Sequence, residues 1–193
     1  YQTHTKPLCW TTTQRHHQRA GVFNHSKEIV VNIFVLDSNP HLAAMYHTDR
    51  HIVKMPTETA QMISFVYHDS ALWEGEIPDF VMGFSKTHYK HPCSIWIRES
   101  LSNFKYACEF GLALYNEYQY RYENPEKHQR AKQIFNFALK SLPNIPDKGL
   151  TKFAIAMDEE FVCADPIESY RTYYKYGKKH LHTWKNRTKP TWI

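Results

Sequence analysis

Residues 91–122, HPCSIWIRESLSNFKYACEFGLALYNEYQYRY, decide the fold that this chain is expected to adopt. Apolar side chains recur along this stretch at spacings of three and four residues, at Ile97, Leu101, Phe104, Cys108, Leu112 and Tyr115. This spacing is typical of an amphipathic helix that buries one face. We therefore predict the longest helix of the protein from Pro92 to about Tyr122, as a pillar around which the other helices pack.

Shorter helices are predicted on both sides of this pillar. Three pairs place an amide or carboxylate cap directly before a proline at the first helical position: Asn39-Pro40, Asn124-Pro125 and Asp165-Pro166. The predicted segments are residues 40–54, 57–68, 125–142 and 166–184. The first should end before Pro56, because a proline disfavours helical geometry in the residue that precedes it.

One short strand is predicted before the first helix. Residues 29–36, IVVNIFVL, form an apolar run that ends at Asp37-Ser38-Asn39. Residues 1–28 show no apolar period, so we expect a disordered leader or a segment upstream of a natural start at Val30 or Val31. The expected fold is mainly α: a single compact helical domain over residues 29–193, with four to five helices and one short N-terminal strand.

The overall composition is ordinary for a soluble globular protein, with 42% hydrophobic and 22% charged residues. No apolar run approaches the roughly 18 residues that span a bilayer, and the first residues do not resemble a secretion signal. We therefore expect an intracellular monomer without membrane contact. The cysteines lie far apart and are expected to be reduced: Cys9, Cys93, Cys108 and Cys163. P-loop, dinucleotide-binding and serine-hydrolase motifs do not occur.

Positive charge is concentrated at the C-terminal end. The last 23 residues carry seven Lys or Arg and no Asp or Glu, and residues 1–30 have a net charge of +3. Because the net charge of the whole chain is +5, residues 31–170 have a net charge of −5. Lysines and arginines neutralise phosphates and flat rings stack on bases, so this segment indicates DNA as a partner. A solvated helix face is the alternative. The candidate contacts are Arg171, Tyr174, Lys175, Lys178, Lys179, Trp184 and Lys185.

Residues 47–55, HTDRHIVKM, gather ionisable groups within two helical turns. Asp49 falls among apolar residues, where a carboxylate is costly unless it is paired or used. It is therefore a candidate catalytic group together with His51, and the alternative is a buried salt bridge, for instance to Arg98. His47 and His51 have a spacing that could hold a metal, but no third ligand is identifiable, so we expect neither a metal nor a cofactor.

A second cluster follows in residues 88–103. A histidine before a helix start, with an arginine further along the helix, can bind a phosphate or a base near the positive helix end. The candidate pocket residues are Lys54 from the first cluster and His91, Trp96, Arg98 and Asn103 from the second. The second cluster equally fits a set of caps and salt bridges. Glu117 and Arg121 are expected to form an ordinary pair on the helix surface.

Several stretches of the chain resemble a group of short, mostly uncharacterised proteins of bacteriophages and marine viruses. The segments that carry this resemblance are VNIFVLDSNP (31–40), DRHIVKM (49–55), HPCSIWIRESLSNF (91–104), EYQYRY (117–122), DPIESYRTYY (165–174) and WKNRTKPTW (184–192). Membership of that group implies no particular activity. It does imply the cytoplasm of an infected host cell as the location.

A more distant likeness concerns activity. The segments HLAAMY (41–46), YKHP (89–92) and YYKYGK (173–178) look like the pyrimidine-dimer DNA glycosylases of the endonuclease V type. That likeness implies a compact helical protein whose basic, aromatic C-terminal segment lies against DNA. It also implies a Schiff base formed by the N-terminal amine, and a glutamate in the first helix. At the position of that glutamate this sequence has Thr48 and then Asp49.

The likeness implies a viral DNA-repair enzyme, a pyrimidine-dimer glycosylase/AP lyase with Asp49 as the activating carboxylate. Two alternatives stay open. One is a non-catalytic nucleic-acid-binding protein in which Asp49 is a structural ion pair, and the other is an enzyme acting on free or modified nucleotides. The enzymatic hypothesis requires one cavity, beside the cationic C-terminal segment, that contains Asp49, His51, His91 and Arg98.

Overall fold

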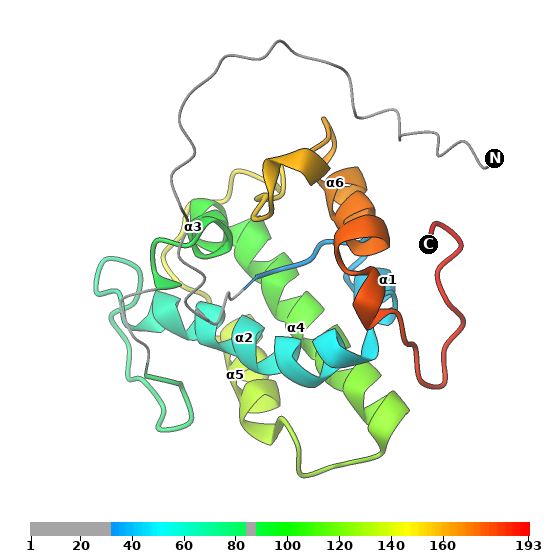
Figure 1. Ribbon diagram of the computed structural model, residues 1–193. Coiled ribbons are helices and arrows are strands. Elements are labelled where there is room, and N and C mark those ends of the chain that lie inside the picture. Colours follow the sequence, from blue (N-terminus) through cyan, green and yellow to red (C-terminus); the bar gives the residue numbers. More distant parts are fainter. Residues whose placement is uncertain (1–31, 84–87) are drawn as a thin grey trace, which may run out of the picture.

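The computed structural model describes residues 32–83 and 88–193, which fold as a bundle of helices (Figure 1). The α-helices are α1 Pro40–Met45, α2 Asp49–Tyr67, α3 Pro92–Glu99, α4 Leu101–Tyr122, α5 Gln129–Lys140 and α6 Pro166–Thr172. Shorter helical turns cover Glu159–Phe161, Tyr173–Gly177 and Lys179–Leu181, the second of them a π-helix. The mainly α class is confirmed. Within these two ranges the chain forms no strand, and no helix is long and apolar enough to cross a membrane.

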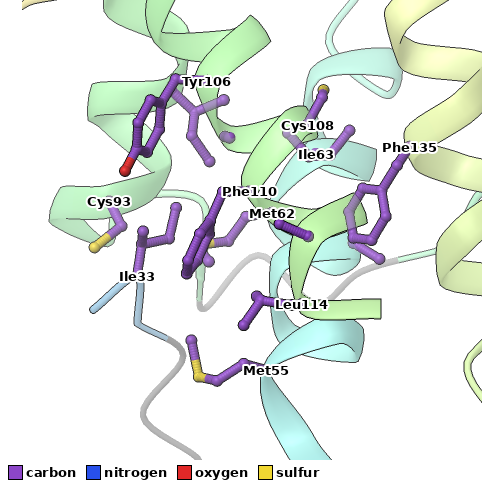
Figure 2. Packing of buried hydrophobic residues seen from close by; sticks show 14 of the residues in the cluster. Ile33, Met55, Met62, Ile63, Cys93, Tyr106, Cys108, Phe110, Leu114 and Phe135 are labelled. Carbon is purple, nitrogen blue, oxygen red and sulfur yellow. The ribbon is translucent and has the colours of Figure 1, made fainter. Parts of the chain in front are cut away.

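Helix α4 lies at the centre of the bundle, and α1, α2, α3 and α5 all pack against it (Figure 1). The core between these helices is made of large apolar side chains, among them Met62, Phe110, Leu114 and Phe135 (Figure 2). Gly111 allows α5 to approach α4 closely, because a Cβ at this position would lie 2.4 Å from the ring of Phe135. The predicted pillar is thus confirmed for residues 101–122.

The pillar does not extend back to Pro92, because the helix is interrupted at Ser100. This residue has extended backbone angles, with φ −148° and ψ 145°, and it separates α3 from α4. Its hydroxyl donates a hydrogen bond to the carbonyl of Gly149 at 2.7 Å and accepts one from the N–H of Lys148 at 3.0 Å. A contact with a distant connector therefore ends one helix and begins the next.

The helix predicted over residues 40–54 is also divided, and its boundary with the helix predicted over 57–68 is wrong. Asn39 caps α1 as expected, since its side chain accepts hydrogen bonds from the first backbone N–H groups. The chain then turns at residues 46–48, and α2 runs without interruption through Pro56 to Tyr67. A proline inside a helix removes one backbone hydrogen bond. The buried face of α2 that packs on α4 outweighs this loss.

Two further helix starts give different outcomes. Asp165 and Pro166 begin α6 as predicted, with the Asp165 carboxylate accepting from the N–H of Ile167 at 3.0 Å. By contrast, α5 begins at Gln129 rather than at residue 125, because the residue before it, His128, is held in the left-handed region with φ 65°. The helix predicted to reach residue 184 is wrong beyond residue 177, since only a short turn follows the π-helix.

Residues 32–36 are buried, as the apolar run 29–36 predicts, although they have no regular secondary structure. Asn32 fixes this segment. Its amide donates to the carbonyl of Ala156 at 2.8 Å, and its oxygen accepts from the Tyr170 hydroxyl at 3.2 Å and from the Cys93 thiol at 3.3 Å. Burial raises the pKa of that thiol to about 11. Residues 29–31 of the expected strand, and the expected leader over residues 1–28, lie outside the described residues.

Candidate active site

Two adjoining pockets open beside the N-terminal half of α2. The outer pocket has a volume of about 560 Å³ and is lined by Asp49, Arg50, His51, Val53, Lys54, Tyr122, Lys178, His180 and Leu181. The inner pocket has a volume of about 570 Å³ and is lined by Asn32, Phe34, His51, Lys54, Glu58, Ala156, Met157, Asp158, Tyr173 and Lys178. His51, Lys54 and Lys178 belong to both pockets. Each volume is typical of a small-molecule site.

Helix α2 supplies one wall of both pockets. His51, Lys54 and Glu58 follow one another at spacings of three and four residues, so they lie on one face of the helix. The opposite walls come from distant parts of the chain. The π-helix Tyr173–Gly177 brings in Tyr173 and the Lys178 that follows it, with the N–H of Lys178 bonded to the carbonyl of Tyr173 at 3.0 Å. Irregular turns of this type are frequent at functional sites.

His51 is held rigidly. Its ring stacks on Phe34 with centroids 4.6 Å apart and 10° between the planes, and its Nδ1 is hydrogen-bonded to the hydroxyl of Tyr174. Tyr174 is fully buried, and this is the sole partner of its hydroxyl within the described residues. A buried phenol must donate its hydrogen, so Nδ1 accepts and Nε2 carries the ring proton. His51 therefore presents an N–H donor at the pockets.

The imidazole of His51 stays neutral. Burial lowers its pKa to about 2, and the nearby positive charges of Lys54 and Lys178 add to the effect. His47, one turn earlier, is fully enclosed and donates from Nδ1 to the carbonyl of Ala43 at 2.7 Å. Burial lowers the pKa of His47 to about 3. Neither histidine is therefore a source of positive charge near neutral pH.

Glu58 is the carboxylate of the inner pocket. Its side chain is 8% exposed, and its Oε1 lies 3.0 Å from the Nζ of Lys54, which is 43% exposed. Its other oxygen, Oε2, is buried and has no hydrogen-bond partner within the described part of the chain. A buried acceptor without a partner costs roughly 1–3 kcal/mol. A ligand that donates to Oε2 would recover this free energy.

The outer pocket carries a positive rim. Arg50 and Lys178 line it, Lys54 is paired with Glu58, and the one acidic side chain of the outer pocket, Asp49, is already neutralised. Asp49 accepts from Arg121 Nη1 at 2.9 Å and from the backbone N–H of Lys185 at 2.8 and 3.0 Å. The cations of the rim are thus left to attract an anion from solvent.

Asp49 has the contacts of the buried ion pair considered above, with Arg121 in place of Arg98. The side chain of Arg121 is 0% exposed, and it also donates to Glu117 at 2.7 Å and to the carbonyls of Met45 and His47 at 2.9 Å. The expectation of a surface pair between Glu117 and Arg121 is wrong, because the turn at residues 46–48 and the C-terminal segment enclose it. This network fixes the turn that leads into His51.

The cluster of residues 88–103 lines neither pocket. Trp96 and Asn103 are buried, and the Asn103 amide donates at 2.8 Å to the carbonyl of Trp96 and to the hydroxyl of Thr151. His91 caps α3 by accepting from the N–H of Cys93 at 3.2 Å. The amide of Asn103 and the ring of His91 are thus committed to local structure, whereas the buried Nε1 of Trp96 has no hydrogen-bond partner among the described residues.

Arg98 lies at the other end of α2 from Asp49. It covers the ring of Tyr89 at 3.7 Å and donates to the Tyr89 carbonyl at 2.8 Å, and the Tyr89 hydroxyl binds Asp69, which follows the end of α2. Nineteen residues of helix span about 28 Å. The expected single cavity is therefore wrong: Asp49 and His51 meet at the pockets, whereas His91 and Arg98 do not join them.

The C-terminal candidates divide into anchors and surface cations. Tyr174 is buried and so does not belong to an exposed binding surface, contrary to expectation. Arg171 pairs with Asp37 at 3.1 Å, and the Trp184 indole donates to the carbonyl of Tyr46 at 3.0 Å. The anchored segment leaves side chains at or near the surface at Lys175, Lys178, Lys179 and Lys185, of which Lys178 lines the pockets.

Glu58, Phe34 and Tyr173 were not among the residues predicted from the sequence. A signal for Glu58 exists in its spacing of seven and four residues from His51 and Lys54. The other two come from distant segments, for which no local pattern gives a signal. Among the described residues no three His, Cys, Asp or Glu side chains gather as a metal site. No protein-family model, curated protein or solved structure matches the chain.

Proposed function

We propose that this protein is a DNA-repair enzyme of the glycosylase/AP lyase type, with its active site in the outer and inner pockets. The observation that carries the proposal is the pair of Lys54 and Glu58, which sets an amine 3.0 Å from a buried carboxylate in a cavity with a cationic rim. A carboxylate beside a potential amine nucleophile is the pairing that Schiff-base chemistry on a sugar requires.

The chemistry follows from these two groups. Glu58 Oε1 accepts a proton from the Lys54 ammonium, and the neutral amine attacks C1′ of the damaged nucleotide. The bond from C1′ to the base breaks, and the base leaves with the electron pair and takes up a proton. The attached nitrogen then loses one proton. Its lone pair forms the C1′=N bond as the bond from C1′ to O4′ breaks, and O4′ takes up a proton, which gives the protonated Schiff base. The resemblance assigns this amine to the N-terminus, which lies outside the described residues.

Contact with the DNA backbone is assigned to the cations around the outer pocket. Lys178 and Arg50 line it, and Lys175 and Lys179 belong to the same C-terminal segment as Lys178. Each phosphate that such a group neutralises lowers the logarithm of the binding constant by about 0.9 for every tenfold rise in salt. The non-catalytic binder remains the second candidate, because the contacts of Asp49 are those of a structural ion pair.

The test is borohydride trapping on ultraviolet-irradiated duplex DNA. We expect a covalent adduct with the unaltered chain and no adduct with Lys54→Ala or with Lys54→Arg, which keeps the charge. Lys140→Ala, at an exposed lysine on α5 that lines neither pocket, should leave trapping unchanged. Trapping that survives both Lys54 variants would assign the amine elsewhere. Salt-dependent binding of DNA without any adduct or nicking would establish the binder.

A further inference from the structure

The charges along the pocket wall of α2 change sign from one end to the other. Arg50 lines the outer pocket, Lys54 lines both pockets, and Glu58 lines the inner pocket. Arg50 and Glu58 are eight residues apart, which is about 12 Å along a helix. The site therefore attracts an anion at its outer end and accepts hydrogen bonds at its inner end.

The two compartments also differ in their apolar lining. The inner pocket contains the rings of Phe34 and Tyr173 together with Ala156 and Met157. Tyr173 suits a flat ring system, because aromatic rings stack on bases of any sequence, and Phe34, whose ring is stacked on His51, adds apolar lining. Beside them lies Glu58 Oε2, a buried oxygen without a partner in the described residues, which accepts hydrogen bonds only.

The geometry points to a single extruded nucleotide as the ligand, with its base in the inner pocket and its phosphate in the outer pocket. A nucleotide has the same layout as the site, with an anionic phosphate at one end and a flat base that carries N–H donors at the other. A base must leave the helical stack to enter such a pocket. This inference rests on the proposed function and names the unit of DNA that enters the site.

Roles follow for the pocket residues. Glu58 Oε2 accepts from an N–H of the base, and the Nε2–H of His51 donates to an oxygen of the nucleotide. Lys178 and His180 hold the phosphate. Thymidine gives the sharpest probe, since N3–H is the single N–H of its base, so that methylation of N3 removes the donor and leaves the ring otherwise unchanged.

The experiment measures binding of free probes to the full chain by calorimetry at low salt. The probes are thymidine 5′-monophosphate, its N3-methyl derivative, thymidine and 2-deoxyribose 5-phosphate. We expect the monophosphate to bind at least about tenfold more tightly than each of the other three probes. The N3-methyl derivative lacks the N–H donor, thymidine lacks the phosphate, and 2-deoxyribose 5-phosphate lacks the base. Equal binding of the monophosphate and 2-deoxyribose 5-phosphate would overturn the base pocket. Equal binding of the N3-methyl derivative would overturn the role of Glu58.

Variants separate the two ends of the site. Glu58→Gln should weaken the binding of thymidine 5′-monophosphate and leave the binding of 2-deoxyribose 5-phosphate unchanged. Lys178→Met should weaken the binding of both phosphates and leave the binding of thymidine unchanged. Glu109→Gln, at an exposed position on α4, is the matched control. If Glu58→Gln binds every probe as the unaltered chain does, the assignment fails. Nucleotide binding without borohydride trapping would refute the chemistry alone, and trapping without nucleotide binding would refute the pocket assignment alone.

Discussion

Replacement of Arg121 by methionine should destabilise the fold more than any exposed arginine replacement. The guanidinium is fully buried and donates to two carboxylates, of Asp49 and Glu117, and to the carbonyls of Met45 and His47, at 2.7–2.9 Å. Removal of one partner from a buried ion pair costs about 3–5 kcal/mol. For a chain of this length each kcal/mol lowers the melting temperature by roughly 2–4 °C, so the expected loss is about 6–20 °C.

The assay is urea and thermal unfolding followed by far-ultraviolet circular dichroism, which reports the helices directly. Arg130→Met is the control, because Arg130 also donates to backbone carbonyls, at 2.7 Å to Phe80 and 3.3 Å to Val81, but is exposed to solvent. Its loss should cost less than about 1 kcal/mol. If Arg121→Met lowers the free energy of unfolding no more than Arg130→Met, the network around Asp49 does not support the fold as described.

Three further predictions concern the buried groups. Because the pKa values of His47 and His51 are about 3 and about 2 in the folded state, the unfolded chain binds more protons below pH 6.5, and stability should fall as pH decreases from there. Each histidine contributes about 1.4 kcal/mol per pH unit to the slope of the free energy of unfolding against pH. His47→Gln should therefore reduce this slope by about that amount. An unchanged slope would show that His47 is not buried in its neutral form. Nitrogen NMR of the ring should show the Nε2–H tautomer of His51. Tyr174→Phe should produce a mixture of the two tautomers. The same mixture in the unaltered chain would disprove that the Tyr174 hydroxyl donates to Nδ1 of His51. Gly111→Ala should destabilise by about 1–3 kcal/mol in urea unfolding, because the new Cβ would lie 2.4 Å from the buried ring of Phe135, whereas helix propensity alone predicts a gain of about 1 kcal/mol.

Much of the fold could be predicted from local pattern. The three- and four-residue spacing identified α4, and the Asp165-Pro166 pair identified the start of α6. The interruptions could not be predicted in the same way, since they depend on distant partners. Ser100 leaves the helix because its hydroxyl binds Lys148 and Gly149, which come far later in the chain.

The candidate site could be predicted only in part. The cluster of ionisable residues on the first turns of α2 drew attention to His51 and Lys54, and charge drew attention to Lys178. The polar residues of segment 88–103 were wrongly predicted to line the pocket. His91 instead caps α3, and Asn103 donates to the buried carbonyl of Trp96. For Glu58 the sequence offers only its spacing from His51 and Lys54, because the other walls of the inner pocket come from distant segments.

The inner pocket joins residues 32 and 34 with residues 156–178, more than 120 positions away in the chain. Helices form from neighbouring residues, whereas such a junction requires closure of a long loop, which is entropically costly and slow. During refolding from urea, helical circular dichroism should therefore recover earlier than nucleotide affinity. The order of folding follows from this topology, because the helices form first and the pocket that binds the nucleotide forms last.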